Sequence, residues 1–453
     1  MEDQCVTVRE ITVAAGVFAP GHLGELTQIV PFEMVDAALE ETGTAQVRIR
    51  DLPARVTVYL LLAAGLFEGI GYRQVWDKLT AGLGGLAVAR PTGGALWQAR
   101  ARLGPAPLRW LFDLLRGPAA DVVSGAVRWH GLVVCAIDGT SMSVPDSDRN
   151  LAVYARQTGS HGGSGYPLLR LVALVACGTR TVMDAVYGPM GRGELELTRR
   201  LLRSMRAGMI VLMDRNFGAT WLTGLIAGTG ADLLVRLTAS RKPPVLRRYP
   251  DGSYLSRIGA VEVRIVECEI TIATAAGRRT GSYRLATTLL SWRQHPAAEL
   301  ITLYHERWEI ETVFLELKST MLGGRVLRAR TPAGIAQEIY ALLTVYQVLR
   351  IAITDAAAAG GGADPDRGSF TIALNAARDL LIQAAGVIAG TVIDLTGSIG
   401  RRVLANLMPG RRLRVSPRIV KRALSRYPAK GPNITRRTYR ATLSISILAG
   451  PET

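Results

Sequence analysis

Alternating strand-like and helix-like segments between residues 131 and 238 restrict the fold more than any other feature of this sequence. Three apolar, strand-like runs come first, and a helix, a strand, a helix and a strand follow (131–144, 166–178, 179–188, 194–208, 209–217, 219–228 and 231–238). Strands that alternate with helices form sheets whose faces the helices cover. We therefore predict an α/β domain with a mixed sheet flanked by helices.

Two of the apolar runs lead into an aspartate. In the first predicted strand (131–144) the apolar residues end at Asp138, which precedes Gly-Thr. In the strand predicted at 209–217 they end at Asp214, which precedes Arg-Asn. A strand that ends in this way delivers its carboxylate to the sheet edge, where ligands collect in open α/β folds. A single aspartate there is more often a turn former or a helix cap. The pair becomes informative only together with a third acid.

Residues 301–318 supply that acid on a predicted helix. The stretch has no Gly or Pro, and its apolar residues recur at helical spacing. Tyr304, Arg307, Glu311 and Lys318 fall within a stripe about 60° wide. A carboxylate flanked by cations and a phenol suits a metal ligand beside a phosphate backbone. The alternative is a solvated face with ordinary i,i+4 pairs such as Arg307–Glu311.

Charge and composition indicate a polyanionic partner. The formal net charge is +17, and residues 401–440 hold thirteen Lys or Arg and no acid, among them Arg411, Arg412 and Arg414. For such a block nucleic acid is the first candidate, and a membrane surface is less favoured because the segment lacks an amphipathic apolar face. The longest apolar run is too short to span a bilayer, and the N-terminus lacks the apolar core of a signal peptide, so we expect a cytoplasmic protein.

Histidine and cysteine spacing excludes the common zinc and disulfide patterns. The four cysteines lie far apart, and the five histidines form no ligand motif. A bound metal would therefore need oxygen ligands, which favours magnesium or manganese.

The chain divides by pattern into three regions. Residues 1–120 are predicted to form an N-terminal helical domain, 125–350 the sheet domain with a β-rich insertion at about 240–290, and 365–453 a helical and basic C-terminal region. Within the first region, 72–83 and 91–103 are consistent with a helix-turn-helix that presents Gln98, Arg100 and Arg102 to DNA. A plain helical bundle is the alternative.

The order IDGT, MDRNFG and YHERWEIETVFLELK resembles the DDE transposases of bacterial insertion sequences, in the group with a Y-x2-R-x3-E-x6-K signature. Tyr304, Arg307, Glu311 and Lys318 fit that spacing without a gap. The segment from 48 to 83 also resembles the N-terminal domain of the fourth insertion-sequence family.

This resemblance implies a ribonuclease H-like catalytic fold. Asp138, Asp214 and Glu311 would bind two Mg²⁺ ions, with Mn²⁺ as a substitute. Water would nick a transposon end, and the resulting 3′-hydroxyl would attack the opposite strand and later the target DNA. Tyr304, Arg307 and Lys318 would contact phosphates of the terminal inverted repeats.

Relatives also flip a base out of the duplex and stack it on an aromatic residue of the β insertion. Tyr283 or Trp292 would serve here, with ordinary packing as the alternative reading. Synapsis of two ends implies a homodimer on DNA, associated with the nucleoid. Two rival functions stay open: a catalytically silent DNA-end-binding protein derived from a transposase, and a ribonuclease H-like nuclease without end specificity.

Overall fold

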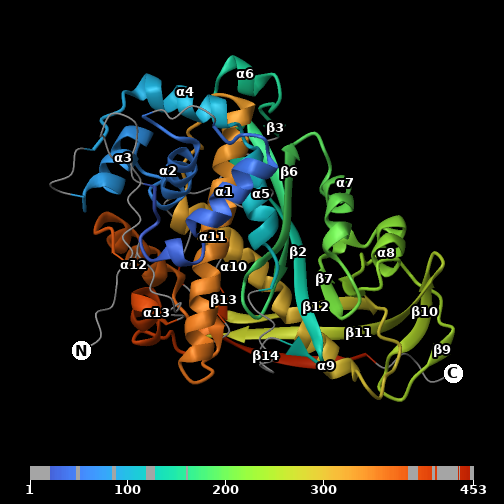
Figure 1. Cartoon of the computed structure of the whole chain (residues 1–453). Helices are drawn as coiled ribbons and strands as arrows, with labels where there is room; N and C mark the ends of the chain where they lie inside the picture. The colour runs from blue at the N-terminus through green and yellow to red at the C-terminus, as the bar shows by residue number, and fades with distance from the viewer. Residues whose placement is uncertain are drawn as a thin grey trace. The chain divides into compact units, whose positions relative to one another are not determined.

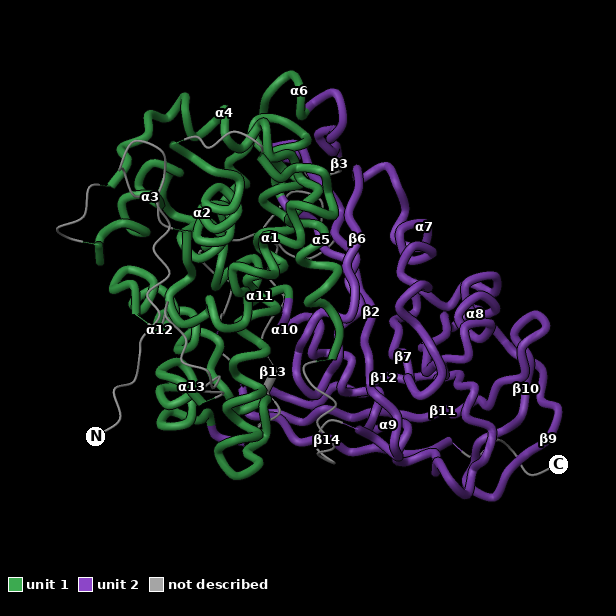
Figure 2. The backbone as a smooth tube through the Cα atoms, viewed as in Figure 1, with its two compact units in different colours: residues 1–122, 143–150, 314–408 green, residues 123–142, 151–313, 409–453 purple. Residues whose placement is uncertain are grey.

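The chain forms two compact units, which Figure 2 distinguishes by colour. Unit 1 comprises residues 1–122, 143–150 and 314–408, and unit 2 comprises 123–142, 151–313 and 409–453. The computed structural model describes residues 21–46, 51–83, 88–118, 128–159, 162–385, 396–410, 414–415, 437 and 439–448. The units cut the chain differently from the three consecutive regions predicted from sequence, because the helices after residue 313 bury their apolar surface within unit 1.

At one end of its path, the sheet of unit 2 has the strand order β8-β7-β2-β5-β6, and Figure 1 labels β7, β2 and β6 of these strands. These strands are β2 (Leu132–Ser143), β5 (Leu168–Ala176), β6 (Val182–Pro189), β7 (Met209–Met213) and β8 (Asp232–Arg236). β7 is parallel to β2 and to β8, whereas β5 and β6 are antiparallel. This mixed sheet with a central first strand is the ribonuclease H-like arrangement, so the predicted fold class is confirmed.

One face of this sheet is covered by short helices. Period-2 alternation turns Cys135 and Ile137 of β2 and Val211 of β7 toward the same apolar cluster. The helices on this face contribute residues such as Leu197 and Leu222, and they are α7 (Glu194–Thr198), its 3₁₀ continuation η2 (Arg199–Ser204) and α8 (Thr220–Ala227). The residues of opposite parity on β2, including Asp138, therefore face away from this cluster.

The predicted β insertion extends the central sheet. β12 (Gly277–Thr287) pairs with β8, and β11 (Val261–Thr274) pairs with β12. The shorter strands β9 (Arg247–Arg248) and β10 (Tyr254–Ile258) follow in the same sheet. The C-terminal strand β14 (Tyr439–Ile447) pairs with β11 and with β13 (Arg414–Val415), a return to the sheet that the sequence analysis did not anticipate.

Unit 1 is a bundle of helices around one long apolar helix, α11 (Pro332–Ala359). Contacting it are α2 (Ala54–Leu66), α5 (Ala106–Leu115), α12 (Phe370–Ile382) and α13 (Gly397–Leu404), with α1 (Phe32–Glu41), α3 (Tyr72–Thr80), α4 (Gly93–Leu103) and α6 (Asp148–Leu151) completing the unit. Among the described helices α11 is long and apolar enough to cross a membrane by composition, but most of it is buried inside the protein. It is a core helix.

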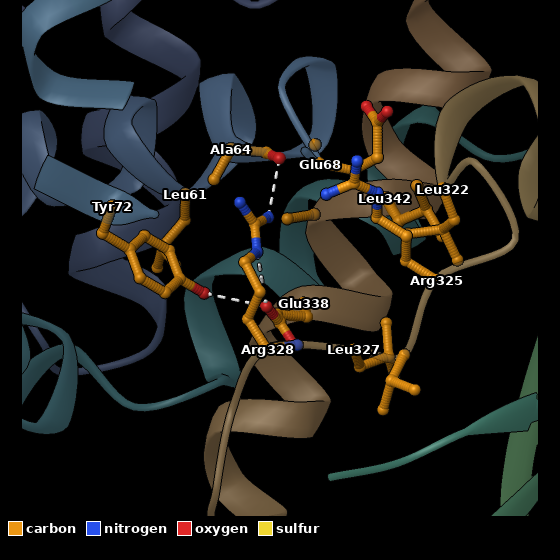
Figure 3. Close-up of a pocket in the computed structure, with 13 residues that line it drawn as sticks. Leu61, Ala64, Glu68, Tyr72, Leu322, Arg325, Leu327, Arg328, Glu338 and Leu342 are labelled. Atoms are coloured by element: carbon orange, nitrogen blue, oxygen red, sulfur yellow. Dashed lines mark hydrogen bonds and ion pairs between the residues drawn. The ribbon is translucent and has the colours of Figure 1, made fainter. Parts of the chain in front are cut away.

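A buried carboxylate on α11 anchors the bundle to the loop before it, as Figure 3 shows. The sequence predicts that Glu338 pairs with an arginine such as Arg350 or one from elsewhere, and the partner is Arg328, whose Nε lies 3.0 Å from Oε1 of Glu338. Tyr72 donates to the same carboxylate, and Arg328 also donates to the carbonyl of Ala64 at 2.7 Å. Every charge in this small pocket thus has a partner, so the pocket is structural.

Candidate active site

Asp138 and Asp214 lie one residue beyond a parallel strand pair. β2 and β7 are in register from Val133 opposite Met209 to Ile137 opposite Met213, so the next residue of each chain segment is an aspartate. Neighbouring strands are about 4.8 Å apart, which places the two backbones side by side. β2 itself continues to Ser143. The strand therefore does not end on Asp138, as the sequence suggested, and only its pairing with β7 stops there.

The environment of Asp138 disfavours its negative charge. Burial raises the pKa of Asp138 to about 7, and the nearby charges of Asp214 and Glu194 act in the same direction. The N–H of Gly139 donates to Oδ1 at 2.8 Å and lowers the pKa, as does the guanidinium of Arg307. A group of carboxylates that raises the pKa of one member is a setting in which a bound cation stabilises the ionised form.

Asp214 begins the short 3₁₀ turn η3 (Arg215–Phe217) that follows β7. Its Oδ1 accepts the backbone N–H of Asn216 at 2.7 Å, an ordinary cap interaction. The capping role and the ligand role predicted from sequence are compatible, because a carboxylate has further lone pairs to offer.

Arg307 links the acid on β2 to the acid on the helix. Its Nη1 lies 3.8 Å from Oδ2 of Asp138, and its Nη2 lies 4.0 Å from Oε1 of Glu311. Its side chain is 9% exposed, and the guanidinium stacks on Trp308 at 4.8 Å. A buried cation is thus placed between two of the three predicted metal ligands.

Tyr304 supports the strand that carries Asp214. Its ring is buried, and its hydroxyl donates to the carbonyl of Met213 at 3.1 Å. Burial raises the pKa of Tyr304 to about 12, so the phenol keeps its proton at neutral pH. This hydrogen bond fixes the residue immediately before Asp214.

The helix predicted for residues 301–318 is present, but it is not a uniform α-helix. The segment consists of α9 (Ala297–His305), a 3₁₀ turn η4 (Glu306–Trp308), α10 (Glu309–Leu315) and a π-helical turn η5 (Glu316–Met321). Buried ion pairs hold the two later segments: Glu309 contacts Arg180 in unit 2, and Glu316 contacts Arg350 in unit 1. These tertiary contacts override a uniform helical period. Lys318 lies on η5, within unit 1.

The donor chemistry of Asp138, Asp214 and Glu311 fits a hard divalent cation, since all three offer carboxylate oxygens. Within the described ranges, however, no three acidic, histidine or cysteine side chains are gathered tightly enough to hold an ion. The structure brings Asp138 beside Asp214, and it joins Asp138 to Glu311 through Arg307. An ion bridging Asp138 and Glu311 therefore requires the Arg307 side chain to move.

The predicted DNA-contacting residues outside this centre lie in varied surroundings. Arg100 stacks on Tyr72 at 3.6 Å within unit 1, whereas Arg102 on the same helix is exposed. Arg411 and Arg412 lie outside the described residues, and the backbone of Arg414 lies in β13.

The two aromatic candidates for base stacking differ in their surroundings. Tyr283 is half-buried on β12, with the guanidinium of Arg236 over its ring at 3.9 Å. Trp292 lines an open hollow of about 510 Å³ together with Tyr249, Arg247 and Arg293.

Sequence reasoning missed one acid at the centre. Glu194 opens α7, where a carboxylate is ordinarily expected only to complement the helix dipole. In the structure its carboxylate lies against Gly139, next to Asp138. The signal that could have revealed it is the glycine directly after a strand aspartate, since glycine permits close approach of another group.

Two family models match the chain. The model for the insertion element 4 transposase N-terminal region matches residues 20–113, and the transposase DDE domain matches residues 129–348. The sheet order and the paired aspartates, together with these matches, define a DDE-type polynucleotidyl transferase. The chain belongs to the IS4 family of DDE transposases.

A known transposase is similar to this chain over most of its length. The chain is 27% identical over 409 residues to the transposase InsG for insertion sequence element IS4 of Escherichia coli (strain K12), covering 87% of this chain and 91% of that protein. The structure also resembles the cryo-EM structure of the piggyBac transposase synaptic complex with hairpin DNA, at a TM-score of 0.42 and 10% identity, over 85% of this chain and 84% of that one.

Proposed function

We propose that this transposase moves its insertion sequence by cut and paste. In the first step a water oxygen bonds to a phosphorus at the element's end as the bond to the 3′ oxygen breaks, leaving a 3′-hydroxyl. The oxygen of that hydroxyl then bonds to a phosphorus of the opposite strand as that strand's bond to its flanking 3′ oxygen breaks, which joins the two strands in a hairpin. A second water opens the hairpin and restores the 3′-hydroxyl, whose oxygen later bonds to a target phosphorus as a P–O bond of the target strand breaks. The observation that carries the proposal is the register of Asp138 with Asp214, beside Arg307 and Glu311.

Asp138, Asp214 and Glu311 would hold two Mg²⁺ ions, for which Mn²⁺ can substitute. Such a pair of ions, when bound, activates the attacking oxygen and stabilises the leaving oxygen. The protein's own contribution is to fix the carboxylates: Tyr304 holds the backbone at Met213, and the Gly139 N–H orients the Asp138 carboxylate.

Arg307 takes a second role once DNA is bound. Its guanidinium lies between Asp138 and Glu311, two of the residues that would hold the ions, and a DNA phosphate offers it another anionic partner. We assign Arg307 and Lys318 to phosphates of the transposon end. We assign Tyr304 a structural role instead: its hydroxyl already donates to the carbonyl of Met213, at the end of β7.

The remaining DNA contacts follow the charge of the chain. Arg102 and the basic segment 401–440 would bind the terminal repeats and target DNA, and Trp292 or Tyr283 would stack a flipped base. Joining two ends requires two active centres, so we expect a homodimer on DNA, acting at the nucleoid in the cytoplasm.

A nicking assay tests this function. The substrate is DNA carrying the inverted repeats that flank the gene, and the proteins are wild type, Asp214→Asn and Asp379→Asn, whose aspartate is exposed in unit 1. We expect Mg²⁺-dependent nicking by wild type and Asp379→Asn, and binding without nicking by Asp214→Asn. Binding without cleavage by all three proteins would support the silent DNA-binding alternative, and equal cleavage of scrambled ends would indicate a nuclease without end specificity.

A further inference from the structure

Glu194 approaches the catalytic strand more closely than any residue with a side chain at position 139 would allow. A Cβ on Gly139 would lie 2.8 Å from Oε1 of Glu194 and 2.9 Å from its Cδ. Atoms are not found so close, so the carboxylate rests directly on the backbone that follows Asp138. Alternation along β2 turns position 139 to the opposite face from Asp138. Glu194 therefore supports the catalytic strand from behind.

The carboxylate of Glu194 is held in this place by a loose ion pair. Nε of Arg170 on β5 lies 3.8 Å from Oε1 of Glu194, beyond hydrogen-bond distance. Arg170 also donates through Nη1 to the carbonyl of Arg192 at 2.7 Å, which ties it to the loop before α7. The ion pair thus positions Glu194 without fully neutralising it.

A neighbouring acid provides the comparison that separates this role from a helix-terminal one. Glu196 lies in the same first turn of α7, but its side chain is 59% exposed and its cation partner is Arg192, 3.8 Å away. Either glutamate would complement the helix dipole. Only Glu194 touches the segment that carries Asp138, so the dipole does not explain its close approach.

We propose that Glu194 is an acidic positioning residue behind the catalytic centre. It fixes the Asp138–Gly139 segment and adds negative potential there, so that the centre fills at a lower concentration of divalent cation. This inference rests on the proposed metal-dependent function. Mutual repulsion between Glu194 and the acids of the centre is relieved when a cation binds.

Metal binding without DNA tests the proposal. Mn²⁺ is titrated into the full-length protein, and free Mn²⁺ is followed by electron paramagnetic resonance. Outer residues that orient metal ligands typically change affinity by about 10- to 100-fold, and for Glu194→Gln we expect a loss of about tenfold. Glu196→Gln removes the same charge from the same helix and should bind Mn²⁺ like wild type. Equal affinities of the two variants would overturn the proposal.

The nicking rate gives a second readout. At saturating Mg²⁺ the Glu194→Gln protein should recover to within about threefold of the wild-type rate, because only filling of the site is impaired. A rate that stays low at saturating metal would contradict this role and indicate general damage to the fold.

Gly139→Ala tests the same contact from the side of the strand: it keeps the charges of Asp138 and Glu194 and should also weaken Mn²⁺ binding. The Asp214→Asn variant distinguishes a failure of the Glu194 proposal from a failure of the proposed metal-dependent function. If Asp214→Asn binds Mn²⁺ like wild type, the proposed metal centre itself is wrong.

Discussion

Arg307 and Asp138 form a buried ion pair between a 3₁₀ turn and the central strand, with Nη1 of the arginine 3.8 Å from Oδ2 of the aspartate. The same guanidinium lies 4.0 Å from Glu311. The positive charge of Arg307 therefore offsets part of the repulsion between Asp138 and Glu311. The proposed metal ions would offset the same repulsion. Competition between the guanidinium and the ions is the physical basis of the first prediction.

Replacing Arg307 should move the pH dependence of metal binding. Arg307 lowers the pKa of Asp138, so in Arg307→Gln that carboxylate ionises at higher pH. We expect the midpoint of Mn²⁺ binding against pH to rise, and binding at pH 9 to be at least as tight as in wild type because a competing cation is gone. Arg215→Gln, at an exposed arginine next to Asp214, is the control. An unchanged midpoint would show that Arg307 does not act on Asp138.

Asp138 should make the metal-free protein less stable as the pH rises. The pKa of Asp138 is about 7 in the folded protein, against an ordinary value of 3.8 that applies to the unfolded chain. Between pH 3.8 and pH 7 the folded protein therefore keeps a proton that the unfolded chain loses. Stability is then fully present below pH 4 and declines up to about pH 7. Asp138→Asn should be more stable than wild type at pH 8, by up to roughly 4 kcal/mol, and the difference should vanish toward pH 4. Urea denaturation in the presence of a chelator measures it, and a pH-independent difference would refute the assignment.

Tyr304→Phe separates structural support from DNA contact. Loss of the hydrogen bond to Met213 should lower the free energy of unfolding by about 1 kcal/mol. The dependence of DNA affinity on salt should stay the same, because no phosphate contact is lost. If the slope of log K against log salt instead becomes shallower by about 1, the value for one phosphate contact, the hydroxyl binds phosphate and our assignment of Tyr304 is wrong.

The buried pair that anchors the π-helical turn should be costly to break. Arg350 is fully buried and pairs with Glu316, which also accepts from Tyr346 at 2.9 Å. Arg350→Met leaves the carboxylate without this buried cation and should cost about 3–5 kcal/mol. The double variant Glu316→Gln, Arg350→Met should recover much of that loss in urea denaturation. A single variant as stable as wild type would show that the pair contributes nothing to the stability of unit 1.

The sheet and two of its acids could be predicted because their signals are local. An apolar run before Asp138 and another before Asp214 predict buried strands, and parallel strands bring their carboxyl ends to one edge. The i,i+4 spacing of Arg307 and Glu311 likewise indicates their contact, which the structure contains. Each of these inferences needs only the period of one element.

The missed features depend on contacts between distant parts of the chain. The 3₁₀ turn within the predicted helix lies beside Glu309, which pairs with Arg180, more than a hundred residues away. The alternation in β14 is visible in the sequence, but only its pairing with β11 shows that it rejoins the sheet. Glu194 lies close to the catalytic strand because residue 139 is a glycine and leaves room for its carboxylate. No local period encodes such contacts.

The most direct measurement is the anomalous scattering of Mn²⁺ in crystals of the protein bound to its own transposon end. We predict two peaks about 3.5–4 Å apart, with Asp138, Asp214 and Glu311 as ligands and the Arg307 side chain turned away from them toward a phosphate. Peaks elsewhere in the molecule, or a bound ion that lacks Glu311 while Arg307 still contacts both acids, would contradict the account.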